Sequence, residues 1–379
     1  MGNESPIGTS SVTFEYTHHL RETAQTKAPN RSKINPKGLP VMAVEANQEC
    51  LKSNEDLPLV LVHRLPSINL PLKAILQAHF HLLDPADSPE PASSFLSSHA
   101  QPVRALICVG YTPITAETLN LLPSLELIVA TSAGVDHIDL QECRRRGIIM
   151  TNASTAFAED AADYAVALLI DVWRRISAAD RFLHAGLWPV KGDYPLGFKH
   201  CFIFFCFRGK RIGIVGLGSI GFEVAKRLEA FGCCIAYNSR KKKPSVPFSY
   251  YANVLGIAAD SDALILCSSL TEQTHHMINK DVMTALGKKG VIINVGRGGL
   301  IDEKELVQFL LRGDIGGAGL DVFENEPDVP RELLELDNVV LSPHRAIFTP
   351  ESFEAVYDLV FTNLKAFFSN KPLQSVFQY

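Results

Sequence analysis

Three glycines, Gly216, Gly218 and Gly221, stand between the apolar run 211–215 and a segment with helical spacing of apolar residues at 220–231. In such a strand–turn–helix unit the glycines permit a tight turn and a close approach of the backbone to a phosphate, while the helix N-terminus supplies amide donors. The glycine pattern alone also occurs by chance and in S-adenosylmethionine sites. Its position between a strand and a helix predicts a dinucleotide site made by Gly216, Gly218, Ser219, Ile220 and Gly221.

Short apolar runs alternate with amphipathic segments from residue 57 onward. The first series falls at 58–63, 105–110 and 125–130, and the second at 211–216, 234–237, 263–267, 291–295 and 339–342. Alternation of this kind is typical of βαβ units. The chain is therefore expected to have an α/β fold with two doubly wound parallel-sheet domains, a long helix over 159–185 between them and a closing helix over 350–371.

The composition of the chain excludes several classes of partner. A formal net charge of -5 and the lack of a long basic stripe argue against a nucleic-acid partner, and no apolar run is long enough for a membrane helix. The eight cysteines and twelve histidines show no CxxC or HExxH spacing. We therefore expect reduced thiols, no disulfide framework and no metal site.

Residues 1–55 lack sustained periodicity and are rich in Ser, Thr, Asn, Pro and Lys. This composition predicts a disordered leader that carries no chemistry. It has no apolar core of a secretory signal, it contains acidic residues that transit peptides usually lack, and Pro6 occupies the position where a myristoylation motif needs Ser or Thr. The expected location is the cytoplasm.

The second strand of the glycine-loop domain is followed by Ser239, Arg240 and Lys241. An NAD site usually has an acidic residue there, which accepts a hydrogen bond from the ribose 2'-hydroxyl. A hydroxyl and two cations instead suit a 2'-phosphate, which a carboxylate would repel. These residues predict a preference for NADP(H), with NAD(H) possible; a solvated basic turn would have the same sequence.

Three further chemical groups follow later strands of the second series: Arg297, Glu326 and His344. Because ligands bind at the carboxyl ends of parallel strands, these side chains are expected to meet in one crevice. A guanidinium binds a carboxylate with two hydrogen bonds, and an imidazole oriented by a carboxylate passes a proton to a carbonyl oxygen. Each residue taken alone also has an ordinary explanation. Arg297 suits a surface ion pair, Glu326 suits an acidic residue in a loop, and His344 suits a helix cap or a histidine hydrogen-bonded in the core.

From Leu57 to its C-terminus the sequence resembles the D-2-hydroxyacid dehydrogenase family, and within it most closely the plant glyoxylate/hydroxypyruvate reductases. The motifs that carry the resemblance are Ser132–Asp139, the glycine loop, Val295–Gly298, Gly319–Val322 with Glu326–Pro327, and Ser342–His344.

The resemblance implies that Arg297, Glu326 and His344 form the catalytic set and that Asp321 contacts the nicotinamide amide. It also implies that the backbone amides of Ala133 and Gly134 hold the substrate carboxylate, and that the protein is a homodimer. The expected domains are a flavodoxin-like substrate domain at 56–152 and 346–379, and a Rossmann dinucleotide-binding domain at 153–345.

The resemblance further implies reduction of small 2-oxo acids, hydroxypyruvate and glyoxylate, to D-glycerate and glycolate, with NADPH as the reductant that Ser239, Arg240 and Lys241 predict. Reduction of hydroxyphenylpyruvate and a non-enzymatic dinucleotide sensor remain alternatives, while a formate dehydrogenase or a methyltransferase would leave Glu326 without a role. The loops at 63–66 and 111–113, and Trp188, are expected to shape the substrate pocket. The chain departs from the family pattern in the apolar residues 200–207 and in its leader.

Overall fold

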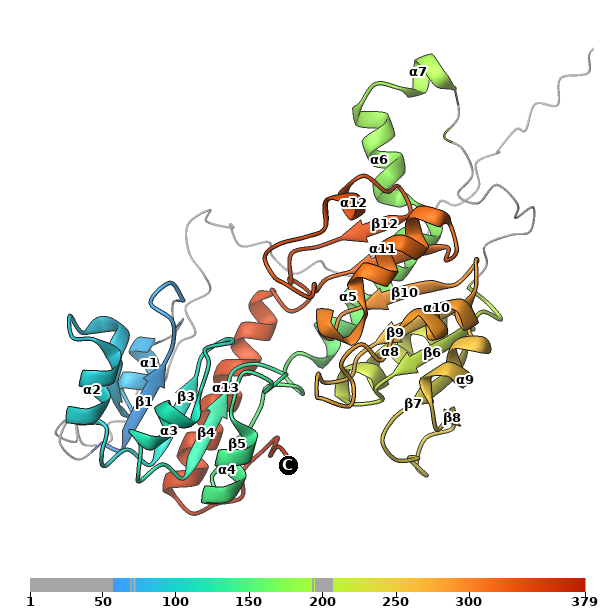
Figure 1. Ribbon diagram of the computed structural model, residues 1–379. Helices are drawn as coiled ribbons and strands as arrows, with labels where there is room; N and C mark the ends of the chain where they lie inside the picture. The colour runs from blue at the N-terminus through green and yellow to red at the C-terminus, as the bar shows by residue number, and fades with distance from the viewer. Residues whose placement is uncertain (1–56, 69, 71–72, 193, 195–206, 379) are drawn as a thin grey trace, which may run out of the picture. The chain divides into compact units, whose positions relative to one another are not determined.

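The computed structural model describes residues 57–68, 70, 73–192, 194 and 207–378 of the 379-residue chain (Figure 1). The predicted leader over 1–55 and all but the last residue of the apolar segment 200–207 lie outside the described residues. Phe207 itself is described, and its ring packs against Trp173 and Phe231 with centroid separations of 5.0 and 5.1 Å. No helix in the described part of the chain has the length and apolar character needed to cross a membrane.

The first series of apolar runs forms a five-stranded parallel sheet with the order β2-β1-β3-β4-β5. Its strands are β1 Leu59–His63, β2 His81–Leu83, β3 Ala105–Cys108, β4 Leu127–Ala130 and β5 Ile149–Thr151. The helical segments between them are α1 Lys73–Gln77, η2 Pro85–Asp87, α2 Ala92–His99, α3 Ala116–Asn120 and α4 Leu140–Arg146.

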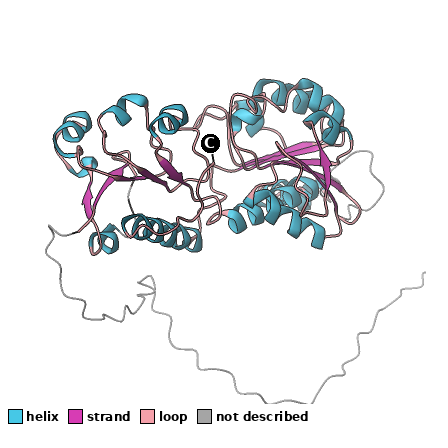
Figure 2. Ribbon diagram, turned by 90° about the horizontal axis from the view of Figure 1, so that it is seen from below, coloured by secondary structure: helices cyan, strands magenta, loops and turns pink. Residues whose placement is uncertain are grey.

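The second series forms a seven-stranded parallel sheet with the order β12-β11-β10-β9-β6-β7-β8. Its strands are β6 Arg211–Val215, β7 Cys234–Asn238, β8 Ser249–Tyr251, β9 Ala263–Leu266, β10 Val291–Asn294, β11 Gly317–Leu320 and β12 Val339–Leu341. Its helical segments are α8 Ser219–Ala230, α9 Val254–Ala259, α10 Lys280–Leu286, η3 Gly298–Leu300, α11 Glu303–Arg312 and α12 Arg331–Leu334. The predicted fold of two parallel-sheet domains is confirmed, with helices on both faces of each sheet (Figure 2).

Burial on both faces explains why the inner strands are continuous apolar runs. All side chains of β3 and β4 are buried, and alternate residues of these strands enter two different core clusters on opposite faces of the sheet. The predicted closing helix is α13, Pro350–Phe368. Its Leu359, Val360 and Leu364 pack with Val60 and Val129, so the C-terminal helix covers the five-stranded sheet although it follows the last strand of the other sheet.

The helix predicted over 159–185 is two helices, α5 Ala158–Arg174 and α6 Ile176–His184, followed by the short α7 Trp188–Lys191. Arg175 between α5 and α6 has a left-handed backbone with a φ of 53°. The backbone N–H and the hydroxyl of Ser177 both donate to the Asp171 carboxylate, the former at 2.8 Å. This local hydrogen bonding competes with the helical pattern, so the helix breaks without a glycine or a proline.

Candidate active site

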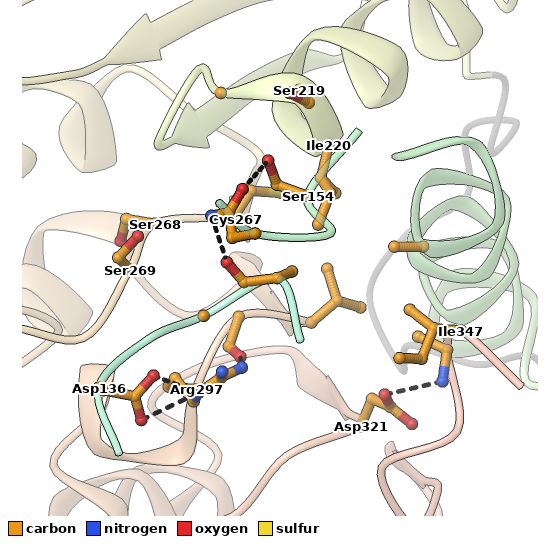
Figure 3. A pocket seen from close by; sticks show the side chains of 18 of the residues that line it. Asp136, Ser154, Ser219, Ile220, Cys267, Ser268, Ser269, Arg297, Asp321 and Ile347 are labelled. Atoms are coloured by element: carbon orange, nitrogen blue, oxygen red, sulfur yellow. Dashed lines mark hydrogen bonds and ion pairs between the residues drawn. The ribbon is translucent and has the colours of Figure 1, made fainter. Parts of the chain in front are cut away.

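The strand order of the larger sheet reverses at β6, because β7 lies on one side of it and β9 on the other. Such a reversal opens a crevice at the carboxyl ends of the strands. A cavity of about 260 Å³ is found there, and it extends to residues of the five-stranded sheet (Figure 3). Of the predicted site residues, eight line it: Ala133, Gly134, Gly218, Ser219, Ile220, Arg297, Asp321 and His344.

The glycine loop has the geometry that a dinucleotide pyrophosphate needs. Gly216 has a φ of +97°, and a Cβ there would lie 2.6 Å from the amide nitrogen of Ser268. A Cβ on Gly221 would lie 2.2 Å from the carbonyl oxygen of Gly216, whereas one on Gly218 would meet nothing within 4 Å. Two glycines therefore allow the close turn, and the third leaves open space in front of the first turn of α8. These residues fit the phosphates of a dinucleotide.

The three residues predicted to select the cofactor follow β7, whose last residue accepts a hydrogen bond of 2.9 Å from Gly216 N. Ser239, Arg240 and Lys241 do not line the cavity. The Ser239 hydroxyl donates to the carbonyl oxygen of Lys241 at 2.7 Å, which closes a tight turn. Arg240 and Lys241 are exposed and form no ion pair in the described part of the chain, so both charges are available to a ligand beside the glycine loop.

Arg297 connects the two sheets. Its Nε donates to both carboxylate oxygens of Asp136 at 3.1 and 3.3 Å, as Figure 3 shows, and its Nη1 donates to the carbonyl oxygen of Gly296 at 2.8 Å. Its Nη2 is buried and has no partner among the described residues. A buried donor without an acceptor carries a free-energy cost of about 1–3 kcal/mol, which a bound anion would remove.

The unpartnered Nη2 lies next to Gly134, where an added Cβ would be 2.0 Å from it. In the described part of the chain neither the Ala133 nor the Gly134 amide N–H donates a hydrogen bond, while both of their carbonyl oxygens accept one, from Asn152 at 2.8 Å and Ser132 at 2.7 Å. The carbonyls are thus fixed and the amide donors remain free. Arg297 Nη2 and these two amides make a donor set suited to a carboxylate.

His344 and Glu326 form a hydrogen-bonded pair. His344 Nδ1 lies 2.7 Å from Glu326 Oε2, and Glu326 Oε1 accepts from the backbone N–H of Phe323 at 3.0 Å. The carboxylate is therefore held on one side by the backbone and orients the imidazole on the other. The opposite ring nitrogen, Nε2, is then the atom that a ligand in the cavity can reach.

Glu326 remains ionised at neutral pH. Burial alone would raise the pKa of its carboxyl, but the hydrogen bonds from His344 and Phe323 and the charges of His344 and Arg297 together hold that pKa below its usual range. The pair has the composition of a general acid with its orienting base.

Asp321, predicted to contact the nicotinamide amide, lines the cavity but is only 1% exposed. Its carboxylate accepts from the Ser342 hydroxyl at 2.5 Å and from the backbone N–H groups of Arg345 and Ala346 at 2.8 and 3.0 Å. It therefore fixes the loop that carries His344, and its contact with a cofactor stays a prediction.

Two contacts of this site were not predicted. Asp136, the partner of Arg297, lies within the Ser132–Asp139 motif, but nothing in its spacing indicated an ion pair. Tyr111 belongs to the loop 111–113 that was expected to shape the substrate pocket, and it lines the cavity, but the 2.9 Å approach of its hydroxyl to His344 Nε2 was not expected. Both belong to the five-stranded sheet domain, and local pattern gives no signal of a contact with the other sheet.

The sequence predicts no metal site. In the described part of the chain, ligand atoms of His275, His276 and Glu324 all lie within 4.8 Å of one another. His276 Nε2 is 2.8 Å from Glu324 Oε1, and the two imidazole rings stack at a centroid distance of 3.9 Å. The hydrogen bond ties the loop before α10 to the loop after β11.

Comparison with known proteins agrees with this geometry. The family model described as "D-isomer specific 2-hydroxyacid dehydrogenase, NAD binding domain" matches residues 166–346. A glyoxylate/hydroxypyruvate reductase of Arabidopsis thaliana is 54% identical over 329 residues, which cover 86% of this chain and 99% of the relative. A hydroxyphenylpyruvate reductase of Plectranthus scutellarioides is 46% identical over 279 residues, which cover 74% of this chain and 87% of the relative.

Among solved structures, the NADPH-dependent glyoxylate/hydroxypyruvate reductase of Sinorhizobium meliloti in complex with NADP and malonate is similar to this chain. The TM-score is 0.75 at 36% identity, and the match covers 84% of this chain and 96% of the other. The identity and coverage of these relatives extend over both sheets, not only over the glycine-loop domain. The chain belongs to the D-isomer specific 2-hydroxyacid dehydrogenase family, whose members are NAD(P)-dependent oxidoreductases.

Proposed function

We propose that this protein reduces small 2-oxo acids, hydroxypyruvate and glyoxylate, to D-glycerate and glycolate with NADPH. The observation that carries this proposal is one cavity lined by the glycine loop, the unpartnered Arg297 guanidinium nitrogen and the His344 imidazole. Most of the relatives described above are named for the same reaction. A reductase of hydroxyphenylpyruvate is the second candidate, favoured by the relative from Plectranthus scutellarioides.

Each proposed residue has a distinct role. Arg297 Nη2 and the amides of Ala133 and Gly134 bind the substrate carboxylate. His344 donates the proton on Nε2 to the carbonyl oxygen, and Glu326 holds the ring and stabilises its charge. Gly216, Gly218 and Gly221 would hold the reduced cofactor, which would supply a hydride to the carbonyl carbon. His344 is left neutral and regains its proton from solvent.

The cofactor preference is proposed to come from Ser239, Arg240 and Lys241. In the test, initial rates of NADPH and NADH oxidation are measured with hydroxypyruvate, glyoxylate and hydroxyphenylpyruvate. We expect faster turnover with NADPH and with the two small acids. Folded protein that binds NADPH without turning over any of the three acids would refute the enzymatic proposal in favour of a dinucleotide sensor.

Replacing Arg240 by alanine is expected to reduce the preference for NADPH over NADH. A charge-assisted hydrogen bond contributes about 1.5–3 kcal/mol, and exposure places this one at the lower end, so the kcat/KM ratio should fall about tenfold. The Arg144→Ala variant is the control, because Arg144 is also exposed but lies on α4 of the other sheet domain. An unchanged ratio would show that the 2'-phosphate is bound elsewhere.

The Glu326→Gln substitution is expected to lower kcat for hydroxypyruvate reduction by about 10- to 100-fold. The carboxylate holds His344 through a hydrogen bond of 2.7 Å to Nδ1, and a charge-assisted hydrogen bond contributes about 1.5–3 kcal/mol. Burial alone would raise the pKa of Glu326, but the hydrogen bonds from His344 and Phe323 hold it below its usual range, so the carboxylate is ionised and the loss should be the same throughout the neutral pH range.

Profiles of kcat for reduction across the neutral pH range measure this loss. The control is Glu324→Gln, since Glu324 is a neighbouring acid that pairs with His276 and not with His344. If the two variants gave the same profile, the coupling of Glu326 to the acid would be disproved.

We further propose that residues 56–152 and 346–379 form the substrate domain and 153–345 the cofactor domain, supported by the packing of α13 on the five-stranded sheet. Limited proteolysis of the intact protein that cut first inside one of these spans would contradict the boundaries.

We also propose a homodimer, supported by the exposed apolar side chains of Ile176, Leu183, Trp188 and Val190 on α6 and α7. Sedimentation equilibrium tests the dimer, and imaging of the tagged full chain tests the proposed cytoplasmic location.

A further inference from the structure

Tyr111 contacts both chemical groups of the proposed active site from the opposite sheet domain. It follows β3 and the left-handed Gly110, whose φ is +63°. Its hydroxyl lies 2.9 Å from His344 Nε2, and the Arg297 Cζ lies 5.0 Å from the centroid of its ring. The ring also meets His137 edge-on at 5.7 Å.

The hydroxyl of Tyr111 takes the hydrogen-bonding position that a substrate carbonyl oxygen needs. His344 Nδ1 is engaged by Glu326, so Nε2 is the nitrogen that must reach the substrate. Burial raises the pKa of the Tyr111 phenol, which therefore stays neutral in spite of the nearby Arg297. A neutral hydroxyl can donate to the imidazole or accept from the imidazolium, so it satisfies Nε2 in either form. A substrate must displace it.

The ring of Tyr111 also occupies space next to the reaction centre. It lines the cavity described above and a second one of about 270 Å³ that lies along Arg297, His344 and Phe323. With a carboxylate on Arg297 and a carbonyl oxygen on His344, the substituent of a 2-oxo acid has to pass the phenol ring. A hydrogen atom or a hydroxymethyl group is small enough to do so, whereas an aromatic ring of the size of the phenol itself competes for the same volume.

We propose that Tyr111 determines substrate specificity: it selects 2-oxo acids with a small side chain over arylpyruvates by occupying the space that an aromatic substituent needs, and its hydroxyl competes with the substrate for His344. The proposal rests on the proposed function and deepens it. The side chain thus has two separate roles. The ring excludes large substituents, and the hydroxyl competes with the substrate for the proton donor His344. The two roles can be tested separately.

The Tyr111→Phe variant retains the ring and loses the competing hydroxyl. A neutral hydrogen bond contributes about 0.5–1.5 kcal/mol, so KM should fall about 2- to 10-fold, by the same factor for hydroxypyruvate and hydroxyphenylpyruvate. The Tyr111→Ala variant also removes the ring. Its ratio of kcat/KM for hydroxyphenylpyruvate to that for hydroxypyruvate should rise at least about tenfold.

The matched control is Tyr357→Phe. Tyr357 lies on α13, stacks on Phe361 at a centroid distance of 6.2 Å and lines neither cavity, so its substitution should leave KM and selectivity unchanged. The dissociation constant for NADPH, followed by its fluorescence, reports whether each variant is folded.

The outcomes distinguish the proposal from the function on which it rests. A rise in the selectivity ratio in Tyr111→Ala but not in Tyr111→Phe supports the size role, and a uniform fall of KM in Tyr111→Phe supports the competition. A ratio that stays constant in Tyr111→Ala, or a KM that rises in Tyr111→Phe, overturns the respective role while turnover persists. Absence of turnover in the unmodified protein would instead remove the proposed function, and the specificity role with it.

Discussion

Replacing His344 by asparagine is expected to lower kcat for hydroxypyruvate reduction by about 10²- to 10⁴-fold, the usual contribution of a positioned general acid. NADPH binding should persist, because His344 lies outside the glycine loop. Asparagine is preferred to alanine here, since His344 has a left-handed φ of 51° that asparagine tolerates well. The variant thus removes the proton donor with little strain on the backbone.

The chain offers a matched control in His276→Asn. His276 also has a φ of 51° and also pairs with a glutamate, Glu324, at 2.8 Å, but it lines neither cavity. Steady-state rates and NADPH titrations of both variants separate the loss of an acid from the loss of a histidine–glutamate pair. Full activity in His344→Asn would refute the assignment of the proton donor, and equal losses in both variants would point to folding.

The inner strands could be predicted from sequence because they are buried on both faces. β3, β4, β9 and β10 are four-residue runs with every side chain buried, and such runs stand out from the amphipathic segments around them. The edge strands β5 and β8 have three residues each, include exposed positions and contain polar residues, so they did not stand out as apolar runs. The edge strand β12 is as short but entirely apolar, and it was predicted.

The predicted site residues of the larger sheet came together because parallel strands end at one edge. Arg297, Asp321 and His344 follow β10, β11 and β12, which are neighbours in the sheet. The partners from the smaller sheet could not be predicted in the same way. The contacts of Asp136 with Arg297 and of Tyr111 with His344 span 161 and 233 residues, and each joins residues that follow strands of different sheets.

The helix break at Arg175 shows a different limit. Sequence rules search for glycine and proline as helix terminators, and neither occurs there. The break is instead made by Asp171 and Ser177, whose side chains serve equally well on the surface of an unbroken helix. The effect of Asp171 and Ser177 on the helix therefore becomes visible only in the structure, where their hydrogen bonds are seen.

The second large effect is expected at Arg297. In Arg297→Met the length of the side chain is largely kept, but the guanidinium whose Nη2 is proposed to bind the substrate carboxylate is lost. Removing one partner of a buried charge pair costs about 3–5 kcal/mol, which corresponds to a fall in kcat/KM of about 10²- to 10⁴-fold. Most of this loss should appear in KM, because the carboxylate is bound in the ground state as well as in the transition state.

Arg104→Met provides the comparison, since Arg104 likewise pairs with a carboxylate, in a bidentate pair with Glu126 at 2.6 and 2.9 Å. That pair is about half exposed and should contribute at most about 1 kcal/mol to stability and nothing to KM. Arg297→Lys keeps the charge without the planar fork, so its KM should lie between those of the methionine variant and the unmodified protein. If Arg297→Met kept its KM while Arg104→Met behaved as expected, the carboxylate would be held by the Ala133 and Gly134 amides alone, and the unpartnered Nη2 would need another ligand.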